Sequence, residues 1–281
     1  MKKVYMNIID ETYDVVSCDN PIQVVSGHIE VRLARTEEEI KAGQMLRYQV
    51  FFEEMGAKPN DKVRAEKRDF DDFDQICDHL LAFDNSKKGS AKVVATYRLL
   101  REERINHKED FYSSAEFDLS SLYNDHFRGL MGDRQLLELG RSCVKEEYRT
   151  NAVMHLMWKF IARYVDRHKI AYLFGCASLP GIDQEELKIP LSYLCNKHKT
   201  PVEYNIPAVN GMAQKMNYLN EGDYSDKTAL RALAPLIKGY LRLGCYIGDG
   251  AVIDEQFGTT DVFILLPIDR LESRYLSLWA D

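Results

Sequence analysis

The sequence has no membrane-sized hydrophobic run, no clustered cysteines and no excess of positive charge, and each absence excludes a class of protein. The apolar run at 262–266 is strand-sized, whereas a helix that crosses a bilayer needs about 20 apolar residues. The six cysteines are scattered without a Cys-x-x-Cys pair, so we expect reduced thiols and no metal site. The net charge of −7 argues against a nucleic-acid partner. No signal peptide is visible, so we expect a cytoplasmic protein.

What is present predicts one α/β domain over 28–281, preceded by an irregular arm over 1–27. Hydrophobic content is 45% over 281 residues, enough for one large core. We expect a charged loop at 58–70, a polar stretch with short helical pieces at 101–133 and an insertion or lid around 180–224. Alternation and helical spacing predict strands at 28–34, 79–84, 91–100, 135–144, 170–177, 245–253 and 261–267, and helices at 36–55, 150–168 and 225–244, the last kinked at Pro235.

Four short charged segments stand out within this pattern. They read RYQVFF at 47–52, DDFD at 71–74, YR at 97–98 and ELGR at 138–141. Two lie on predicted strands and one on a predicted helix. Together they indicate one cleft lined by both signs of charge, suited to a small zwitterion.

The element order resembles the GNAT acyltransferase fold, and the four segments resemble its acyl-homoserine-lactone synthase branch. The helix exit YLRLGC at 240–245 is similar to the usual Tyr-x-x-x-Gly ending of that fold. The resemblance implies a central mixed, mostly antiparallel twisted sheet. This sheet is splayed at its middle and covered by helices on both faces.

A narrower resemblance is to bacterial ornithine N-alpha-acyltransferases. It rests on LRYQVF at 46–51, ELGRSCV at 138–144, FGCASLPG at 174–181 and GDGAV at 248–252. It implies transfer of a 3-hydroxyacyl chain from acyl carrier protein to the α-amine of L-ornithine, the first step of ornithine lipid synthesis. No metal or other cofactor is expected, because a thioester is already activated. The amphiphilic product implies a peripheral contact with the inner membrane.

The turn before the predicted helix 150–168 departs from the broad GNAT pattern. It reads YRTNAV at 148–153 and lacks the glycines that cradle a pyrophosphate in acetyl-CoA users. A carrier-bound pantetheine has a single phosphodiester, so the departure favours a carrier-protein donor. By this resemblance the donor contacts are Val144, Arg149, Thr150 and Asn151. A docking patch for the acidic carrier is expected around the same helix, at Lys145, Arg149, Arg163, Arg167, His168 and Lys169.

For the acceptor side, the resemblance points to Glu138 as the base that frees the attacking amine; the alternative is a strand glutamate in a salt bridge. Strict alternation would place Arg141 on the opposite face from Glu138. A bulge at Gly140 would bring both to one cleft. Asp71 and Asp74 are expected to fix an ammonium group, unless they form a solvated acidic loop.

Arg47 and Arg98 are predicted to grip the substrate carboxylate. For Arg47 the alternative, which we favour slightly, is an ion pair that holds Asp71 or Asp74 in place. Tyr240 is predicted to protonate the leaving thiolate, or else only to pack with a wet hydroxyl.

Other functions remain open at this point. Within enzymes, the chain could make acyl-homoserine lactones or other N-acyl amino acids. Outside enzymes, it could be an acyl-carrier or lipid-binding module without turnover.

Overall fold

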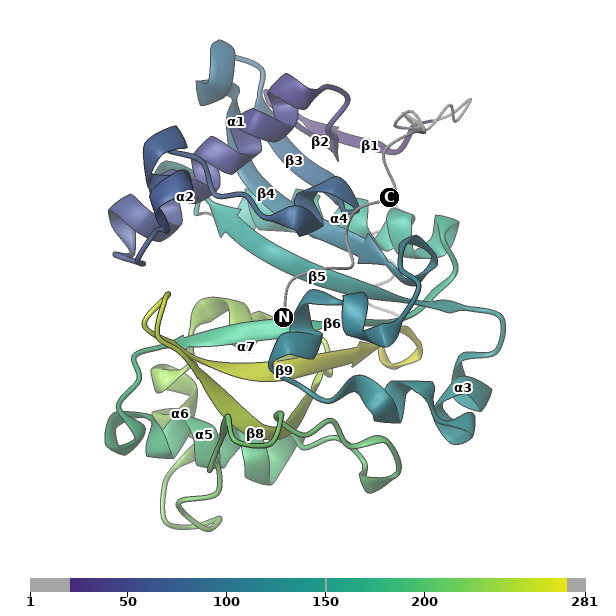
Figure 1. Cartoon of the computed structure of the whole chain (residues 1–281), viewed down its shortest axis with the longest axis vertical. Coiled ribbons are helices and arrows are strands. Elements are labelled where there is room, and N and C mark those ends of the chain that lie inside the picture. The colour runs from purple at the N-terminus through teal and green to yellow at the C-terminus, as the bar shows by residue number, and fades with distance from the viewer. Residues whose placement is uncertain (1–20, 150, 272–281) are drawn as a thin grey trace.

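The computed structural model of the protein describes residues 21–149 and 151–271 (Figure 1). Nine strands within these residues form one twisted sheet, in the order β1-β2-β3-β4-β5-β6-β9-β8-β7. The strands are β1 (Gln23–Ser26), β2 (Ile29–Leu33), β3 (Asp78–Asp84), β4 (Val93–Arg101), β5 (Gln135–Val144), β6 (Ile170–Pro180), β7 (Ala213–Gln214), β8 (Tyr246–Asp254) and β9 (Thr259–Pro267).

Helices cover both faces of this sheet, as the GNAT resemblance implied. One face carries the largest hydrophobic core and lies under α4, α5 and α7. The other lies under α1 and the 100–131 segment with its short turns. The helices are α1 (Glu37–Tyr48), α2 (Asp61–Glu66), α3 (Asp125–Met131), α4 (Asn151–Arg167), α5 (Gln184–His198), α6 (Asp226–Ala232) and α7 (Pro235–Arg242).

The sheet opens at its middle, between its only parallel neighbours among the described strands. The β5–β6 ladder begins at Gln135 and Ile170 and stops at Glu138 and Phe174. The β6–β9 ladder continues as far as Pro180. The second half of β5 therefore diverges from β6, and Figure 1 shows the gap widening toward the left. This confirms the predicted splayed, mostly antiparallel sheet.

The helix that starts after Thr36 forms for the predicted reason. The Thr36 hydroxyl accepts from the backbone N–H of Glu39, which satisfies one of the free donors of the first turn. The helix continues as a π-helical turn over Gln49–Glu54. It ends before Gly56, whose φ of +79° suits glycine.

The structure corrects or adds local detail to four sequence expectations. The charged loop 58–70 contains α2, because Asn60 caps its first turn and Val63 is buried. The described part of the N-terminal arm contains β1, which pairs with β2. The segment 180–224 contains the regular helix α5. Pro235 does not kink one helix but begins a second, where a missing N–H costs nothing.

Candidate active site

A buried network of opposite charges joins α1 to the loop at 69–74. The Arg47 guanidinium on α1 is fully buried and donates to the Asp69 carboxylate at 2.7 Å and to the Asp74 carboxylate at 2.8 Å. Burial alone would raise the pKa of Asp74, but Arg47 and Arg98 hold it below its usual value. The geometry favours the bracing role for Arg47 and Asp74 over direct contact with a substrate.

Arg98 and Arg141 extend this network from β4 and β5 toward the opening of the sheet. Asp71 pairs with Arg98 and lies 3.4 Å from the Arg141 guanidinium. The Asp71 carboxylate also caps the short turn that follows it, so it is not a freely solvated loop residue. The Tyr112 ring lies over the Arg141 guanidinium, 4.8 Å from its centre.

The bulge that the sequence required in β5 is present. Thr96 pairs with Cys143 and Arg98 with Gly140, so Arg141 and Ser142 together oppose the single residue Tyr97. Arg141 has a φ of +49°, a left-handed backbone conformation that non-glycine residues rarely adopt because it is strained. The bulge directs Arg141 toward the same segment, around Tyr112, that Glu138 contacts.

Glu138 is buried beneath the segment 111–116, and both its carboxylate oxygens accept hydrogen bonds. The Tyr112 N–H donates to one oxygen at 2.9 Å, and the Ser113 N–H donates to the other at 2.7 Å. The Ser113 hydroxyl also donates to that second oxygen. Burial raises the pKa of Glu138 and these donors oppose the shift. Glu138 therefore positions the 111–116 segment, and a proton can reach it through Ser113.

Three further carboxylates, which the sequence did not single out, lie close together beside this segment. Carboxylate oxygens of Glu116, Asp254 and Asp261 lie within 4.8 Å of one another. Burial, reinforced by Asp261, raises the pKa of Glu116 to about 7. Glu116 Oε2 is buried without a hydrogen-bond partner among the described residues. Such a group of acids can hold a cation, either an ammonium group or a metal ion.

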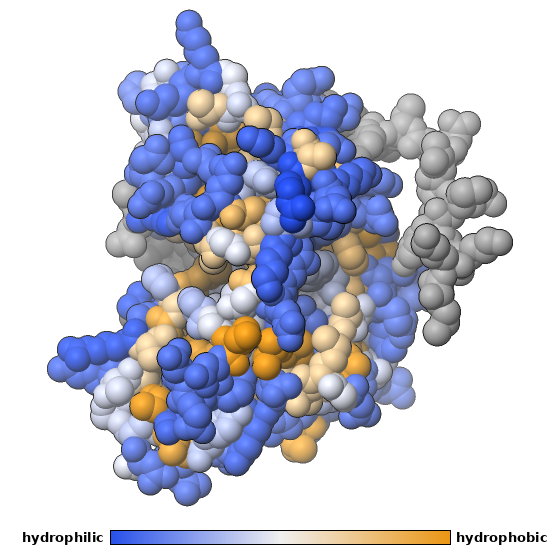
Figure 2. Space-filling model, turned by 60° about the vertical axis from the view of Figure 1, so that its left-hand side comes forward, coloured by the Kyte–Doolittle hydropathy of each residue, from blue (hydrophilic) through white to orange (hydrophobic). Residues whose placement is uncertain are grey.

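A small apolar cavity of about 20 Å³ lies where β5 and β6 separate. Leu139, Trp158, Gly175, Cys176 and Tyr240 are among its lining residues. It has room for about one water molecule, so an acyl thioester would have to widen it. Figure 2 brings forward the side of the molecule toward which β5 and β6 separate in Figure 1. It shows apolar surface gathered near the middle of that side.

The cavity lies between two groups of reactive side chains on opposite faces of the sheet. Glu138 contacts the 111–116 segment, whose Phe111 belongs to the core on the α1 side. Tyr240, on α7, belongs to the core on the α4 side. Cys176 lines the cavity, and its thiol lies 3.4 Å from the Ser113 hydroxyl. This cavity, called the passage below, is thus lined by Tyr240 and connected to Glu138 through Cys176 and Ser113.

The predicted donor contacts are only partly described. Arg149 donates to the Val144 carbonyl at 3.0 Å and pairs with Glu54. Thr150 lies outside the described residues, as does the side chain of Asn151. The expected docking patch is divided. Lys145 and Arg149 precede α4, and the other basic residues cluster toward its far end, about 25 Å away for a helix of this length.

Sequence reasoning missed Ser113, Glu116 and Cys176, and it quoted Tyr97 without giving it a role. Ser113 and Glu116 lie in the irregular stretch 101–133, where no periodicity shows which side chains point inward. Cys176 occurs in the FGCASLPG motif, which was the one available signal.

Comparisons with known proteins show which families the chain is similar to. Residues 46–159 match the acetyltransferase (GNAT) domain family. The L-ornithine N(alpha)-acyltransferase of Brucella abortus (strain 2308) is 44% identical over 256 residues, covering 90% of this chain and 89% of that protein. The enzyme of the same name from Rhizobium meliloti (strain 1021) is 42% identical over 255 residues, covering 90% and 84%.

Among solved structures, the N-acyl amino acid synthase FeeM from uncultured soil microbes superposes with a TM-score of 0.46 at 10% identity. The match covers 89% of this chain and 93% of that one. No helix in the described part of the chain has the length and apolarity that crossing a membrane requires.

Proposed function

The chain belongs to the family of L-ornithine N(alpha)-acyltransferases, and from that premise we propose that it transfers a 3-hydroxyacyl chain from acyl carrier protein to the α-amine of L-ornithine. The product is lyso-ornithine lipid. The single observation that carries the proposal is the cavity where β5 and β6 separate. Tyr240 and Cys176 line it, and the Cys176 thiol lies 3.4 Å from the Ser113 hydroxyl, which donates to Glu138.

The charges beside the passage suit an amino acid with two ammonium groups. Arg98 and Arg141 offer guanidinium groups to a carboxylate, although both also pair with Asp71. Glu116, Asp254 and Asp261 offer carboxylates to an ammonium group. Ornithine carries one carboxylate and two ammonium groups, so it matches both signs at once.

The reaction then removes two protons from the α-nitrogen, one before attack and one as the amide forms, and supplies one proton to the sulfur. The α-ammonium must lose a proton before it attacks the thioester carbonyl. In our proposal the Ser113 hydroxyl passes this proton to Glu138, to which it is already hydrogen-bonded. The amine nitrogen bonds to the carbonyl carbon, the carbon–sulfur bond breaks, and the thiolate takes the proton of the Tyr240 hydroxyl.

The open edge of β5 is available to the donor. Beyond Glu138 the described ladder to β6 ends, so backbone groups of β5 that face β6 are free to bond a pantetheine arm or the developing oxyanion. This supports a thioester donor of any carrier. The choice of acyl carrier protein rests on the turn at 148–153 without glycine. A cytoplasmic location and a peripheral contact with the inner membrane remain predictions.

The test is an acylation assay with the purified chain. The protein is incubated with 3-hydroxyacyl carrier protein and, separately, ornithine, lysine, a neutral amino acid, or S-adenosylmethionine. Products are followed by mass spectrometry. We expect acylated ornithine as the main product. Acyl-homoserine lactone from S-adenosylmethionine would instead support the alternative synthase, and the absence of acylated amine across the panel would end the proposal.

A further inference from the structure

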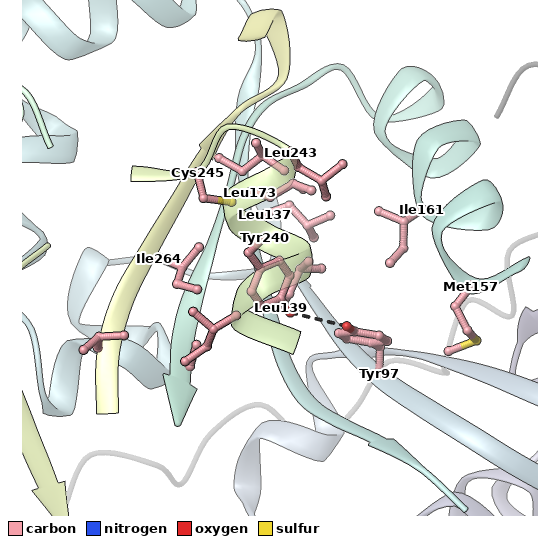
Figure 3. Packing of buried hydrophobic residues seen from close by; sticks show 14 of the residues in the cluster. Tyr97, Leu137, Leu139, Met157, Ile161, Leu173, Tyr240, Leu243, Cys245 and Ile264 are labelled. Carbon is pink, nitrogen blue, oxygen red and sulfur yellow. Dashed lines mark hydrogen bonds between the residues drawn. The ribbon is translucent and has the colours of Figure 1, made fainter. Parts of the chain in front are cut away.

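Tyr97, on β4, meets Tyr240, on α7, in the core behind the passage. The two phenol oxygens lie 3.3 Å apart, within hydrogen-bond distance. Figure 3 shows the rings approaching each other beside Leu139, with the bond drawn between them. Tyr97 is 1% exposed and Tyr240 is 9% exposed. The contact therefore joins two distant parts of the chain inside the hydrophobic core.

The β5 bulge completes this arrangement. Tyr97 is the residue that Arg141 and Ser142 jointly oppose. Burial raises the pKa of the Tyr97 phenol, and the nearby Ser142 side chain lowers it by a smaller amount. The hydroxyl of Tyr97 is paired with that of Tyr240. A buried hydroxyl is costly unless it is bonded, and phenylalanine would fill the same space. The oxygen of Tyr97 thus needs an explanation other than packing.

Tyr97 does not line the cavity itself but lies behind Tyr240. Among the described residues that line the cavity at the β5–β6 opening, Tyr240 is present and Tyr97 is not. Tyr97 can therefore influence the thioester only through the hydroxyl of Tyr240.

We infer that Tyr97 is a positioning residue for the departure of the thiol, holding the Tyr240 hydroxyl in place and stabilising the phenolate it becomes. The inference rests on the proposed function. When the carbon–sulfur bond breaks, the sulfur takes its electron pair and the proton of Tyr240. The Tyr97 hydroxyl then donates to the Tyr240 phenolate. The second proton lost by the nitrogen, released as the amide forms, restores the phenol, while the first stays with Glu138 until product leaves.

The environment agrees with this sequence of events. Burial raises the pKa of Tyr97, and it raises that of Tyr240 further. Both phenols consequently hold their protons at neutral pH, so Tyr240 is a donor at rest. A phenolate formed in this core has little water to stabilise it, and a donated hydrogen bond to a charged oxygen is stronger than one between neutral groups.

The test is Tyr97→Phe, assayed with two donors that carry the same acyl chain. One is the pantetheine thioester of acyl carrier protein. The other is a thiophenol ester, whose leaving group departs as a stable thiolate without a proton. We expect kcat with the carrier thioester to fall about 10- to 100-fold, the loss expected for a hydrogen bond to a charged group. The thiophenol ester should lose less than about threefold, and KM for ornithine should be unchanged.

Two controls separate this role from a structural one. Tyr193→Phe alters another buried tyrosine of the same core, on α5, and should leave both donors unaffected. Tyr240→Phe should show the same donor dependence. The double variant Tyr97→Phe/Tyr240→Phe should be no slower than Tyr240→Phe alone, because the two hydroxyls act as one unit.

The possible failures are distinguishable. An equal loss of kcat on both donors, or no loss with either, in Tyr97→Phe would overturn the positioning role while leaving the proposed function standing. A wild-type protein that acylates nothing would instead defeat the proposed function itself.

Discussion

At the scale of single residues, the structure adds Ser113 to the proton-accepting role that the sequence predicted for Glu138 alone. The sequence correctly pointed to a strand glutamate beside a bulge. It could not show that Tyr112 and Ser113 occupy both carboxylate oxygens, because those partners come from a stretch without periodicity. In the proposed mechanism the base is therefore a pair, with Ser113 nearer the passage and Glu138 behind it.

Removing the hydroxyl of Ser113 tests this pair. Ser113→Ala keeps both backbone donors to Glu138 and loses only the hydroxyl. We expect kcat to fall at least about tenfold, and Glu138→Gln to lower it about a hundredfold, in the range typical of a lost general base. Glu102→Gln is the matched control, since Glu102 also accepts a backbone N–H, that of Leu136. Full turnover in Ser113→Ala would exclude the relay, and full turnover in Glu138→Gln would remove Glu138 from the chemistry.

The elevated pKa of Glu116 predicts a particular dependence of stability on pH. Glu116 holds its proton up to about pH 7 in the folded state, whereas in the unfolded chain it has the ordinary glutamate pKa of 4.5. Between these values the folded state binds more protons, so the contribution of Glu116 to stability is lost as pH rises. Glu116→Gln should therefore gain stability relative to wild type from pH 4.5 to 8, by on the order of 2 kcal/mol.

Urea unfolding of wild type and Glu116→Gln across that pH range measures the difference. A difference between the two proteins that stays flat with pH would contradict the raised pKa. The matched control is Asp72→Asn, because Asp72 is an exposed acid at the start of the turn Asp72–Gln75.

At the scale of elements, the opening between β5 and β6 is the feature of the sheet that we propose admits the thioester. Alternation and spacing predicted β4, β5 and α4 closely. The apolar residues of the strands alternate between the cores on the two faces, and those of α4 face the largest core. These patterns did not predict α2 or the break before Pro235, where a side-chain cap and a missing N–H decide the structure. The splay itself came from family resemblance, since no local pattern marks where a ladder stops.

Gly175 tests how closely the strands approach at the opening. A Cβ added there would lie 2.4 Å from the Leu139 carbonyl oxygen, so β6 or β5 would have to shift. We expect Gly175→Ala to destabilise the protein by about 1–3 kcal/mol, as overpacking does, and to lower kcat/KM for the thioester. Gly129→Ala is the control, because a Cβ there meets nothing within 4 Å on α3. Wild-type stability and activity in Gly175→Ala would show that the contact is not constraining.

The ion pairs of Arg47 brace α1 against the 69–74 loop. Arg47→Met would leave Asp69 and Asp74 buried without this partner, and breaking a buried pair in this way costs about 3–5 kcal/mol. Arg64→Met is the control, because the Arg64–Asp61 pair is exposed. Chemical denaturation measures both. A loss below about 1 kcal/mol for Arg47→Met would mean that the network does not brace this half of the sheet.

At the scale of the whole molecule, the sheet separates the two halves of the chemistry. The acceptor charges and the Ser113–Glu138 pair lie on one face, and the Tyr97–Tyr240 pair lies on the other. The resemblance named Glu138 on one face and Tyr240 on the other, and their roles stay predictions. It could not find the acids at 116, 254 and 261, because they meet only through tertiary folding.

The most direct test of the central claim is the identity and position of the acylated nitrogen. The purified protein is given 3-hydroxyacyl carrier protein with ornithine labelled with ¹⁵N at the α-position, in competition with norvaline, which lacks the side-chain amine. Tandem mass spectrometry locates the acyl group. We predict acyl ornithine bearing the chain on the labelled nitrogen, with norvaline acylated at least about tenfold more slowly, a difference of about 1.4 kcal/mol. Acylation of the side-chain nitrogen, or equal use of norvaline, would contradict the account.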